Sequence, residues 1–397
     1  MIDKSEQYLL DLFLASVSKD YIPSNDIEGI DFSKIYKLAS LSRVTNCVYY
    51  GLLKLDKETL SKISNLSAFK NECLIYGVKE RVQESDIVDI INAFNKENID
   101  MIFFKGYVLK YIYPKLDMRV MGDIDFLVKV EDISRAQKVI ESIGFKKDAD
   151  TDFNVEVGYI RNSEVELHKK LSVAEIKYFD TAFDHKVKFL DYPNTYTFDT
   201  EYHFIYLLSH AHTHMIKGGL GIKYPMDFYL FLNKYDIDFK KIKEDLETTN
   251  LDKFAKLILF ICHKWFNLDL SKYQDFIDGF EFSDEEIETF ELFMLYGGEY
   301  GMFHDRYSIQ NAAVDNKFKY LLSKIFRPFR FVCKTDHPKW WQYLLLPYYY
   351  VRHWFNFFII KGFQNIKKAQ KFVKKESDAF SSMEQLFVKI GTKKDSN

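Results

Sequence analysis

The sequence lacks the features that would place the chain outside the cell or within a membrane. Its 4 cysteines are scattered and form no Cys-x-x-Cys pair, which disfavours both a disulfide framework and a zinc ribbon. The longest apolar runs fall short of the ~20 residues that a membrane-spanning helix needs. Acidic side chains near the N-terminus stand where a signal peptide has basic and then apolar residues. We therefore expect a cytoplasmic protein with no membrane span.

Proline and glycine are scarce as well, with 7 and 16 residues in a chain of 397. This scarcity argues against long disordered linkers and favours helix. The length exceeds what one small core supports, so two or three domains are expected. A net charge of -3 is close to neutral, so charge alone indicates no class of partner.

Three segments differ in their pattern. Residues 1–98 have apolar side chains at helical spacing, and one helix is expected to begin near Ser85. Residues 99–198 follow the order strand, helix, strand, helix, strand, strand, which predicts a compact mixed sheet with helices. Residues 199–397 are again helical and end in a basic, aromatic tail. The fold class expected is α+β, with a small mixed-sheet core flanked by N-terminal and C-terminal helical regions.

The strands of the middle segment are expected at residues 101–104, 123–128, 154–161 and 164–171. The first is an apolar run that ends in Lys-Gly, as a buried strand entering a tight turn does. The last two are separated by Asn-Ser and predict a hairpin.

Two aspartates in the second strand are the strongest chemical signal. Alternate residues of a strand point to the same face, so Asp123 and Asp125 project together while Ile124 and Phe126 enter the core. Carboxylates this close repel each other unless a cation lies between them. Mg²⁺ prefers oxygen ligands and keeps positions open for phosphate. The pair therefore predicts a site for a hard divalent cation.

Glu166 repeats the apolar–acid–apolar pattern on a later strand and is expected to complete this site from the neighbouring strand. An Asp-x-Asp pair by itself is more often a solvated strand end or a turn. The metal-site hypothesis therefore depends on the order of the surrounding elements: a strand ending in Lys-Gly, a short helix, the Asp-x-Asp strand and an isolated strand acid.

The order and identity of these motifs resemble a known family, the uncharacterised bacterial nucleotidyltransferases of family 5, within the polymerase-β-like superfamily. The residues that carry the resemblance are Phe104-Lys105-Gly106, Tyr113-Pro114, Arg119, Gly122 to Val128, Glu166-Leu167-His168, Leu208 to Ala211, His214 and Asp227. One departure is that Tyr107 follows Gly106, where the superfamily usually has a Gly-Ser turn.

The resemblance implies transfer of a nucleoside monophosphate from an NTP to a hydroxyl acceptor, with release of pyrophosphate. The cofactor implied is Mg²⁺, or Mn²⁺ in its place, in a two-metal mechanism. Asp123 and Asp125 would hold the ion bound to the nucleotide. Asp125 and Glu166 would place the ion that activates the acceptor. The acceptor, the base and the oligomeric state are not predicted.

The resemblance also places four residues beside the nucleotide. Gly106 would allow the backbone to approach phosphate, with Gly122 at the start of the acidic motif. Lys105 or Arg119 would neutralise the triphosphate. The alternatives are a solvated turn residue for Lys105 and a salt bridge to a site carboxylate for Arg119.

Histidines form a further group of candidates. His203, His210 and His214 share one helical face, and the last two have the spacing of a zinc pair, although a polar stripe is the simpler interpretation. The resemblance favours His168, His210, His214 and Asp227 as residues that line the pocket facing the sheet.

The basic, aromatic tail suits either a nucleic-acid or membrane surface or, as we favour, a helix packed by its aromatic side chains. This tail is the only support for the hypothesis of an RNA-directed transferase. A catalytically silent scaffold or antitoxin-like binding module is the main alternative to an enzyme, and the presence of all three acids disfavours it.

Overall fold

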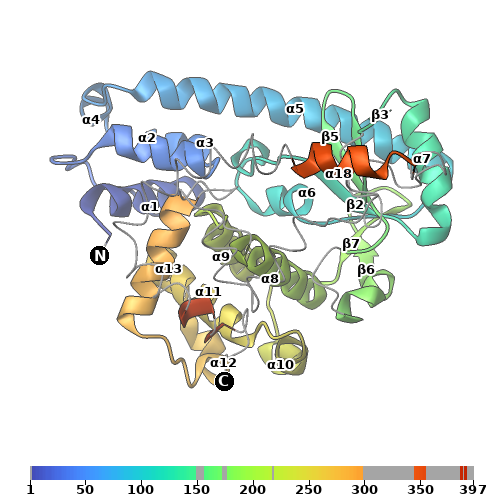
Figure 1. Ribbon diagram of the computed structural model, residues 1–397. Helices are drawn as coiled ribbons and strands as arrows, with labels where there is room; N and C mark the ends of the chain where they lie inside the picture. Colours follow the sequence, from blue (N-terminus) through green and yellow to red (C-terminus); the bar gives the residue numbers. More distant parts are fainter. Residues whose placement is uncertain are drawn as a thin grey trace. The chain divides into compact units, whose positions relative to one another are not determined.

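The computed structural model describes residues 2–148, 156–171, 177–216, 219–297, 344–354, 385–387 and 389–390 (Figure 1). It divides into two compact units, residues 1–306 and residues 307–397, each considered by itself. In the second unit the structure describes one longer helix, α18 (Leu346–Trp354). Most of the basic, aromatic tail lies outside the described residues, and so do the first two residues of the strand expected at 154–161.

The helices of the first unit are α1 (Lys4–Val17), α2 (Phe32–Leu41), α3 (Thr45–Leu52), α4 (Lys57–Ser61), α5 (Leu66–Lys96), α6 (Gly106–Leu109), α7 (Ile133–Ser142), α8 (Thr200–Ile216), α9 (Lys223–Lys234), α10 (Phe239–Thr248), α11 (Asp252–Phe266), α12 (Gln274–Ile277) and α13 (Asp284–Gly297). Its strands are β1 (Met101–Phe103), β2 (Ile124–Leu127), β3 (Lys146–Lys147), β4 (Glu156–Ile160), β5 (Glu164–His168), β6 (Lys186–Lys188) and β7 (Thr195–Phe198). None of the helices formed by the described residues is both long and apolar enough to cross a bilayer.

The strands form one seven-stranded mixed sheet in the order β3-β4-β5-β2-β1-β7-β6. The central strand β2 is parallel to β5 and antiparallel to β1, while β1 is parallel to β7. This arrangement confirms the α+β class, and the expected hairpin is the antiparallel pair β4–β5. The sequence did not predict β3, β6 or β7, which are two to four residues long and too short for a readable alternation.

The helix expected to begin near Ser85 begins much earlier, so that prediction is wrong. Helix α5 runs for 31 residues from Leu66 and lies along the outer edge of the first unit in Figure 1. Three apolar residues in its first half, Leu74, Ile75 and Val78, are 59%, 64% and 63% exposed. Phe69 and Cys73 are buried in this half, but the exposed apolar residues between them and Ser85 obscure the helical periodicity, which becomes clear only after Ser85, where α5 packs against the sheet.

The two faces of the sheet differ in character. One face contributes Phe103, Ile124, Phe126 and the apolar residues of β5 to the core that it shares with α5 and α7. The opposite face carries Phe104, whose ring packs edge-on against Tyr206 of α8 at 5.3 Å between centroids. Because strand residues alternate, the polar residues of β2 and β5 lie on this second face.

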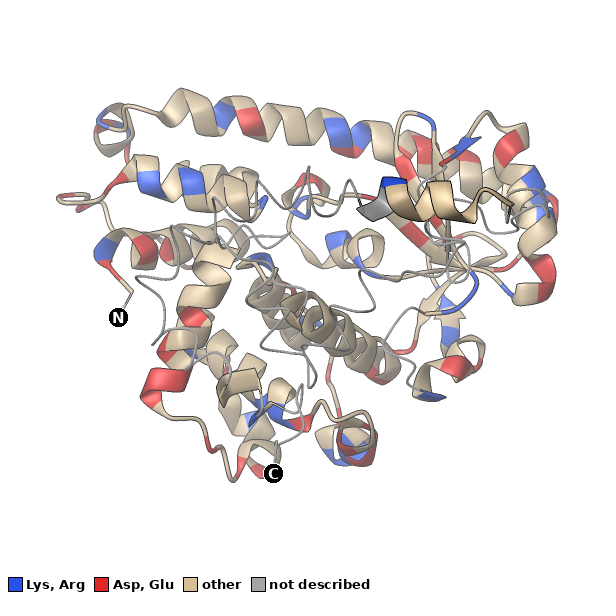
Figure 2. Cartoon of the chain, in the orientation of Figure 1, with Lys and Arg blue, Asp and Glu red and all other residues tan. Residues whose placement is uncertain are grey.

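Helix α8 covers the polar face and carries almost no charge. Its one residue of the Asp, Glu, Lys and Arg types is Glu201, and the helix is correspondingly uncoloured over most of its length in Figure 2. Acidic and basic residues are spread instead over the outer helices of the first unit (Figure 2). A central helix without charged side chains can be buried without the desolvation penalty of unpaired ions.

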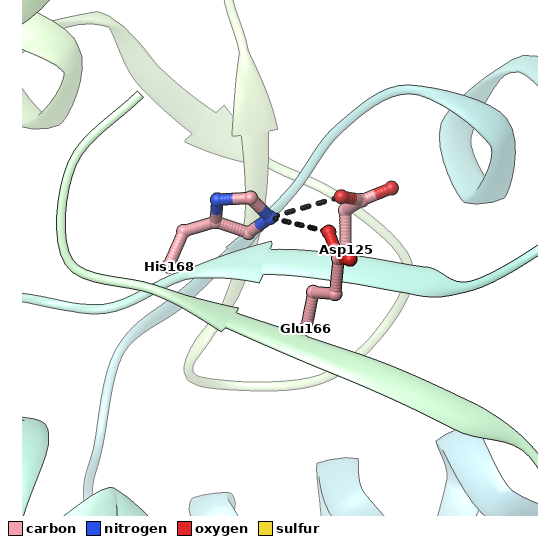
Figure 3. A group of neighbouring side chains, drawn as sticks. All are labelled: Asp125, Glu166 and His168. Atoms are coloured by element: carbon pink, nitrogen blue, oxygen red, sulfur yellow. Dashed lines mark hydrogen bonds and ion pairs between the residues drawn. The ribbon is translucent and has the colours of Figure 1, made fainter. Parts of the chain in front are cut away.

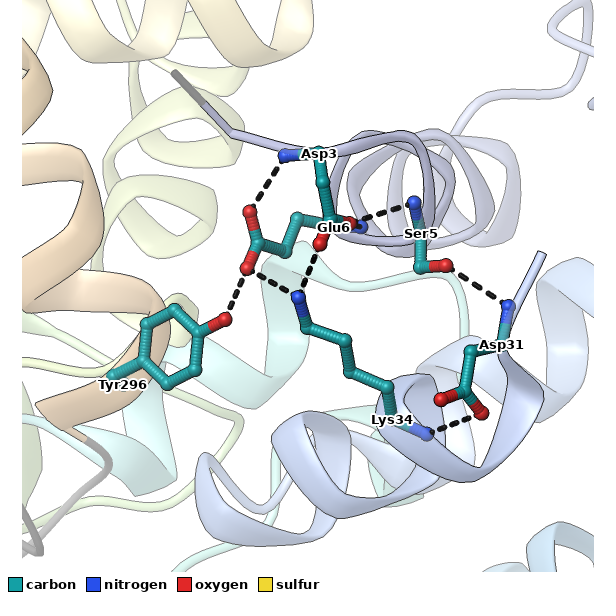
Figure 4. A network of polar contacts seen from close by, with 6 residues as sticks. All are labelled: Asp3, Ser5, Glu6, Asp31, Lys34 and Tyr296. Carbon is teal, nitrogen blue, oxygen red and sulfur yellow. Dashed lines mark hydrogen bonds and ion pairs between the residues drawn. The ribbon is translucent and has the colours of Figure 1, made fainter. Parts of the chain in front are cut away.

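A polar network ties α13 to the two N-terminal helices (Figure 4). Glu6 is 3% exposed and accepts hydrogen bonds from the Asp3 backbone nitrogen at 2.7 Å and from Lys34 Nζ at 2.7 Å. The Tyr296 hydroxyl donates to the same carboxylate. The side chain of Asp3 caps α1 and also accepts from Lys34. The network joins α1, α2 and α13 across a large sequence separation.

A second buried carboxylate anchors the β4–β5 turn to α5. Asp86 is fully buried and accepts from Arg161 Nη2 at 2.6 Å, Asn162 Nδ2 at 3.1 Å and the Ser163 backbone nitrogen at 2.8 Å. Arg161 also donates to Asp89, which is half exposed, at 2.6 Å. Asp86 therefore fixes the turn that leads into β5.

We expect Asp86→Ala to lower the free energy of unfolding by about 3–5 kcal/mol, because it leaves Arg161 without its buried partner. Asp89→Ala removes an exposed partner of the same guanidinium and should cost less than about 1 kcal/mol. Urea unfolding of both variants compares the two effects. Equal losses for the two variants would contradict the anchoring role of Asp86.

A buried histidine of α8 makes the stability of the fold sensitive to acid. His203 is 2% exposed, and burial lowers its pKa from the ordinary 6.5 to about 3. Its ring packs edge-on against Phe198 and Phe231. As the pH falls below 6.5, the unfolded chain takes up a proton on this ring that the folded chain does not accept until about pH 3. This group therefore leaves the free energy of unfolding unchanged above pH 6.5 and lowers it progressively as the pH falls below 6.5.

Between pH 7.5 and 5, protonation of His203 in the unfolded state should cost roughly 2 kcal/mol of stability. His203→Phe keeps an aromatic ring in the same surroundings and cannot be protonated. Urea unfolding at both pH values should show a drop smaller by about this amount in the variant. An identical pH dependence in the two proteins would rule out His203 as a source of acid sensitivity.

Candidate active site

Strand register brings two carboxylates together at the centre of the sheet. Asp125 on β2 is directly opposite Glu166 on the parallel strand β5. Asp125 is 4% exposed, whereas the Glu166 side chain is 25% exposed. Asp123 lies one residue before β2 and is half-buried. The register confirms that Glu166 lies on the strand adjacent to that of Asp125, as expected.

His168 lies at the end of β5, two residues after Glu166, and therefore on the same face of the sheet. Its Nε2 lies 2.9 Å from Asp125 Oδ1 and 3.4 Å from Glu166 Oε2, between the two carboxylates (Figure 3). Its ring packs edge-on against Phe104 at 5.1 Å. The sequence feature that indicated this position is the two-residue spacing of Glu166 and His168, which repeats the spacing of Asp123 and Asp125.

Lys105, two residues after the end of β1 and directly before α6, completes the charged group. Its Nζ lies 2.6 Å from Asp125 Oδ1, and its side chain is 18% exposed. The solvated-turn alternative for Lys105 therefore does not describe this structure. The residue has φ 55° and ψ −133°, a backbone conformation that residues with a Cβ rarely adopt.

The protonation preferences of the carboxylates follow from these contacts. Burial by itself would raise the pKa of Asp125, but the Lys105 ammonium and the hydrogen bond from His168 outweigh it and lower that pKa. The negative charge of Asp125, followed by burial, raises the pKa of Asp123. Burial raises the pKa of Glu166. The site thus holds one firmly ionised carboxylate and two whose ionisation is disfavoured.

His168 and Lys105 are the cationic side of this group. Burial disfavours the charge on His168, but its hydrogen bonds to Asp125 and Glu166 prevail and raise its pKa. Burial likewise disfavours the charge on Lys105, and Asp125 prevails and raises its pKa. Both side chains therefore favour the protonated, positively charged form, which donates hydrogen bonds to the acidic cluster.

The residues present fit a divalent cation. Asp125, Glu166 and His168 each offer one ligand atom, and these atoms lie within 4.8 Å of one another. Asp123 lies close enough for the charge of Asp125 to dominate its pKa, which is the repulsion that a cation would relieve. A donor set rich in carboxylate oxygen suits Mg²⁺ or Mn²⁺.

Arg119 and Asp227 pair with each other. Arg119 Nε lies 2.8 Å from Asp227 Oδ1, and the Tyr113 hydroxyl donates to the same oxygen at 2.8 Å. Both charged side chains are at most 9% exposed. The partner is thus Asp227 of α9, and not one of the three site acids that the alternative for Arg119 named, and the pair links α9 to the segment before β2. A direct role for either residue in nucleotide binding stays a prediction.

The two predicted glycines make structural contacts around the loop between β1 and β2. A Cβ on Gly106 would lie 2.7 Å from Cγ of Met121, so a larger residue there would displace that side chain. The carbonyl oxygen of Gly122 accepts from Lys79 Nζ at 3.4 Å and Gln83 Nε2 at 3.5 Å, both on α5. These contacts hold the two ends of the loop between β1 and β2.

His210 and His214 lie on α8, with their Nε2 atoms 3.1 Å apart. Burial, followed by the charge of Lys105, lowers the pKa of His210 well below its ordinary value, so His210 lies near the acidic group. The buried Lys223 of α9 is another charge that acts on His210. Neither Lys223 nor Tyr206, which packs against Phe104, stood out in the sequence.

The fold and the site define an α+β protein in which carboxylates from adjacent strands meet lysine and histidine side chains on one sheet face. The model of a family described as uncharacterised nucleotidyltransferase matches residues 28–267, more than half of the chain. The chain belongs to this uncharacterised nucleotidyltransferase family. Searches of curated proteins and of solved structures gave no match.

The geometry generates a prediction about which atoms would bind the ion. We expect oxygen ligation only, with His168 donating to Asp125 and Glu166 rather than ligating, because hard cations prefer carboxylate oxygen. Electron spin-echo spectroscopy of the protein with Mn²⁺ and inorganic tripolyphosphate, which contains no nitrogen, should therefore show no directly bound ¹⁴N.

A strong ¹⁴N coupling that disappears in His168→Asn and persists in His263→Asn would instead make His168 a ligand. His263 is a suitable control because it lies on α11, outside the acidic cluster, where its Nδ1 is 2.8 Å from the backbone carbonyl oxygen of Leu268.

Proposed function

We propose that this chain is a metal-dependent nucleotidyltransferase that moves a nucleoside monophosphate from an NTP to a hydroxyl acceptor and releases pyrophosphate. The observation that carries the proposal is the register of β2 and β5, which opposes Asp125 to Glu166 with Asp123 beside them. The membership of the nucleotidyltransferase family supports the same reaction class.

The proposed residues divide the work. Asp123, Asp125 and Glu166 hold Mg²⁺ or Mn²⁺, which would supply Lewis-acid stabilisation of the phosphates and of the attacking oxygen. The acceptor oxygen bonds to the α-phosphorus while the bond from that phosphorus to the pyrophosphate oxygen breaks. Glu166 is assigned to the acceptor, because its side chain is 25% exposed whereas Asp125 is only 4% exposed. His168 holds the carboxylates of Asp125 and Glu166 in position.

The triphosphate is proposed to lie between the sheet and α8. Lys105 and Lys223 bring positive charge to this side of the acidic group, and His210 and His214 add nitrogen donors. Positive and donor groups opposite carboxylates are what a metal-bound triphosphate requires. Arg119 and Asp227 support this wall by joining α9 to the segment before β2.

The test is incubation of the protein with each α-³²P-labelled NTP, Mg²⁺ and a cell extract as the source of acceptor. We expect label transfer from at least one α-labelled NTP and none from the γ-labelled form, since pyrophosphate leaves. Asp125→Asn should reduce transfer by roughly 100-fold or more, because it removes a charge that both proposed ions share. No transfer with any of the four NTPs would favour a silent scaffold.

Glu166→Gln should abolish transfer more severely than it weakens nucleotide binding, since the nucleotide-bound ion is assigned to Asp123 and Asp125. Glu164→Gln is the matched control, because Glu164 lies two residues earlier on β5 and is exposed. Isothermal titration with a non-hydrolysable NTP measures binding separately from turnover. Loss of binding with unchanged turnover of bound nucleotide would overturn the role assigned to Glu166.

A further inference from the structure

The contact between Lys105 and Asp125 occupies the carboxylate on which the proposed metal site depends. Lys105 Nζ lies 2.6 Å from Asp125 Oδ1, and His168 Nε2 lies 2.9 Å from the same oxygen. An ammonium group and a divalent cation at one carboxylate repel each other. A cation that binds Asp125 therefore has to displace Lys105 or accept a strong repulsion from it.

The backbone around Lys105 fixes where its side chain starts. Lys105 has φ 55° and ψ −133° between Phe104, which is fully buried, and Gly106, which packs closely on Met121. Such conformations persist only where the surroundings over-determine them, and they cluster at functional sites. The four-carbon stem beyond this point contains several rotatable bonds, so a change of rotamer brings the ammonium to a second partner without movement of the backbone.

The second partner is available on the side facing α8. Lys105 and Lys223 both act electrostatically on His210, so the ammonium lies close to the wall where the triphosphate is proposed to bind. A triphosphate there offers Lys105 several anionic oxygens in place of the one oxygen of Asp125. Its arrival would give the ammonium a new partner and leave Asp125 to the divalent cation.

We propose that Lys105 is an exchangeable counter-ion: it neutralises Asp125 in the free protein and passes to the phosphates of the nucleotide when the metal binds. The inference rests on the proposed function and deepens it. Metal and nucleotide then bind cooperatively, because each removes an obstacle to the other, and the coupling is reciprocal. The site therefore binds a divalent cation more weakly without a nucleotide than with one.

The experiment measures two affinities for Lys105→Met: that of Mn²⁺ alone, from the free-Mn²⁺ signal in electron paramagnetic resonance, and that of α,β-methylene NTPs in the presence of Mn²⁺. Relative to the unmodified chain, we expect Mn²⁺ alone to bind at least about 10-fold more tightly and the nucleotide analogue at least about 10-fold more weakly. A merely structural role for Lys105 would not move the two affinities in opposite directions.

Three variants control the result. Lys256→Met makes the same change at a lysine of α11 that donates to the backbone carbonyl oxygen of Asp278 at 2.8 Å, outside the acidic cluster, and it should leave Mn²⁺ affinity unchanged. Lys105→Arg keeps the charge and should resemble the unmodified chain. Lys105→Gln lacks the charge but can still donate to Asp125, and it should reproduce the tighter Mn²⁺ binding if Lys105→Met does not fold.

The inference is overturned if the folded charge-removing variants bind Mn²⁺ alone no more tightly than the unmodified chain. Label transfer by the unmodified chain, with no gain in Mn²⁺ affinity in those variants, refutes the exchange and leaves the proposed function standing. The opposite shifts in affinity without label transfer from any NTP refute the proposed function and support the exchange.

Discussion

The mutual repulsion of three carboxylates is the constraint on which the arrangement of the site depends. Asp123, Asp125 and Glu166 lie together on one partly buried sheet face, where their charges are poorly screened. Lys105 and His168 offset this repulsion, and both direct their nitrogen atoms to Asp125. The opposite face of the sheet is apolar and packs on α5 and α7. The free energy gained by this packing offsets the cost of keeping the charged cluster together.

The elements around the sheet position the cluster, and the helix that covers the polar face adds almost no charge to it. Helix α8 places aromatic and histidine side chains over the polar face and has almost no charged residues of its own. The buried Arg119–Asp227 pair links α9 to the loop that leads into β2. Asp86 holds the turn before β5, which carries Glu166 and His168. The loop, the turn and the covering helix together fix the two strands whose register forms the site.

Several parts of this description differ from what the sequence predicted. Helix α5 is longer than expected because exposed apolar side chains in its first half obscure the helical periodicity of the sequence. Arg119 pairs with Asp227 of α9, more than a hundred residues away, which no local pattern could indicate. His168 joins the acidic group directly, although its two-residue spacing from Glu166 already placed both on one strand face. The three-segment organisation at residues 98 and 198 stays a prediction.

Local alternation determined much of the site in advance. It predicted the strand that carries Asp125 and placed Glu166 on a separate strand, because side-chain direction in a strand depends only on position along the chain. The Asn-Ser turn predicted the β4–β5 hairpin. Only the tertiary structure decided that β5 is parallel to β2 in the register that opposes Glu166 to Asp125, and that Lys105 turns back onto the same carboxylate. Strand order, register and a strained backbone are set by the packing of distant segments, and the sequence pattern of a single strand contains none of that information.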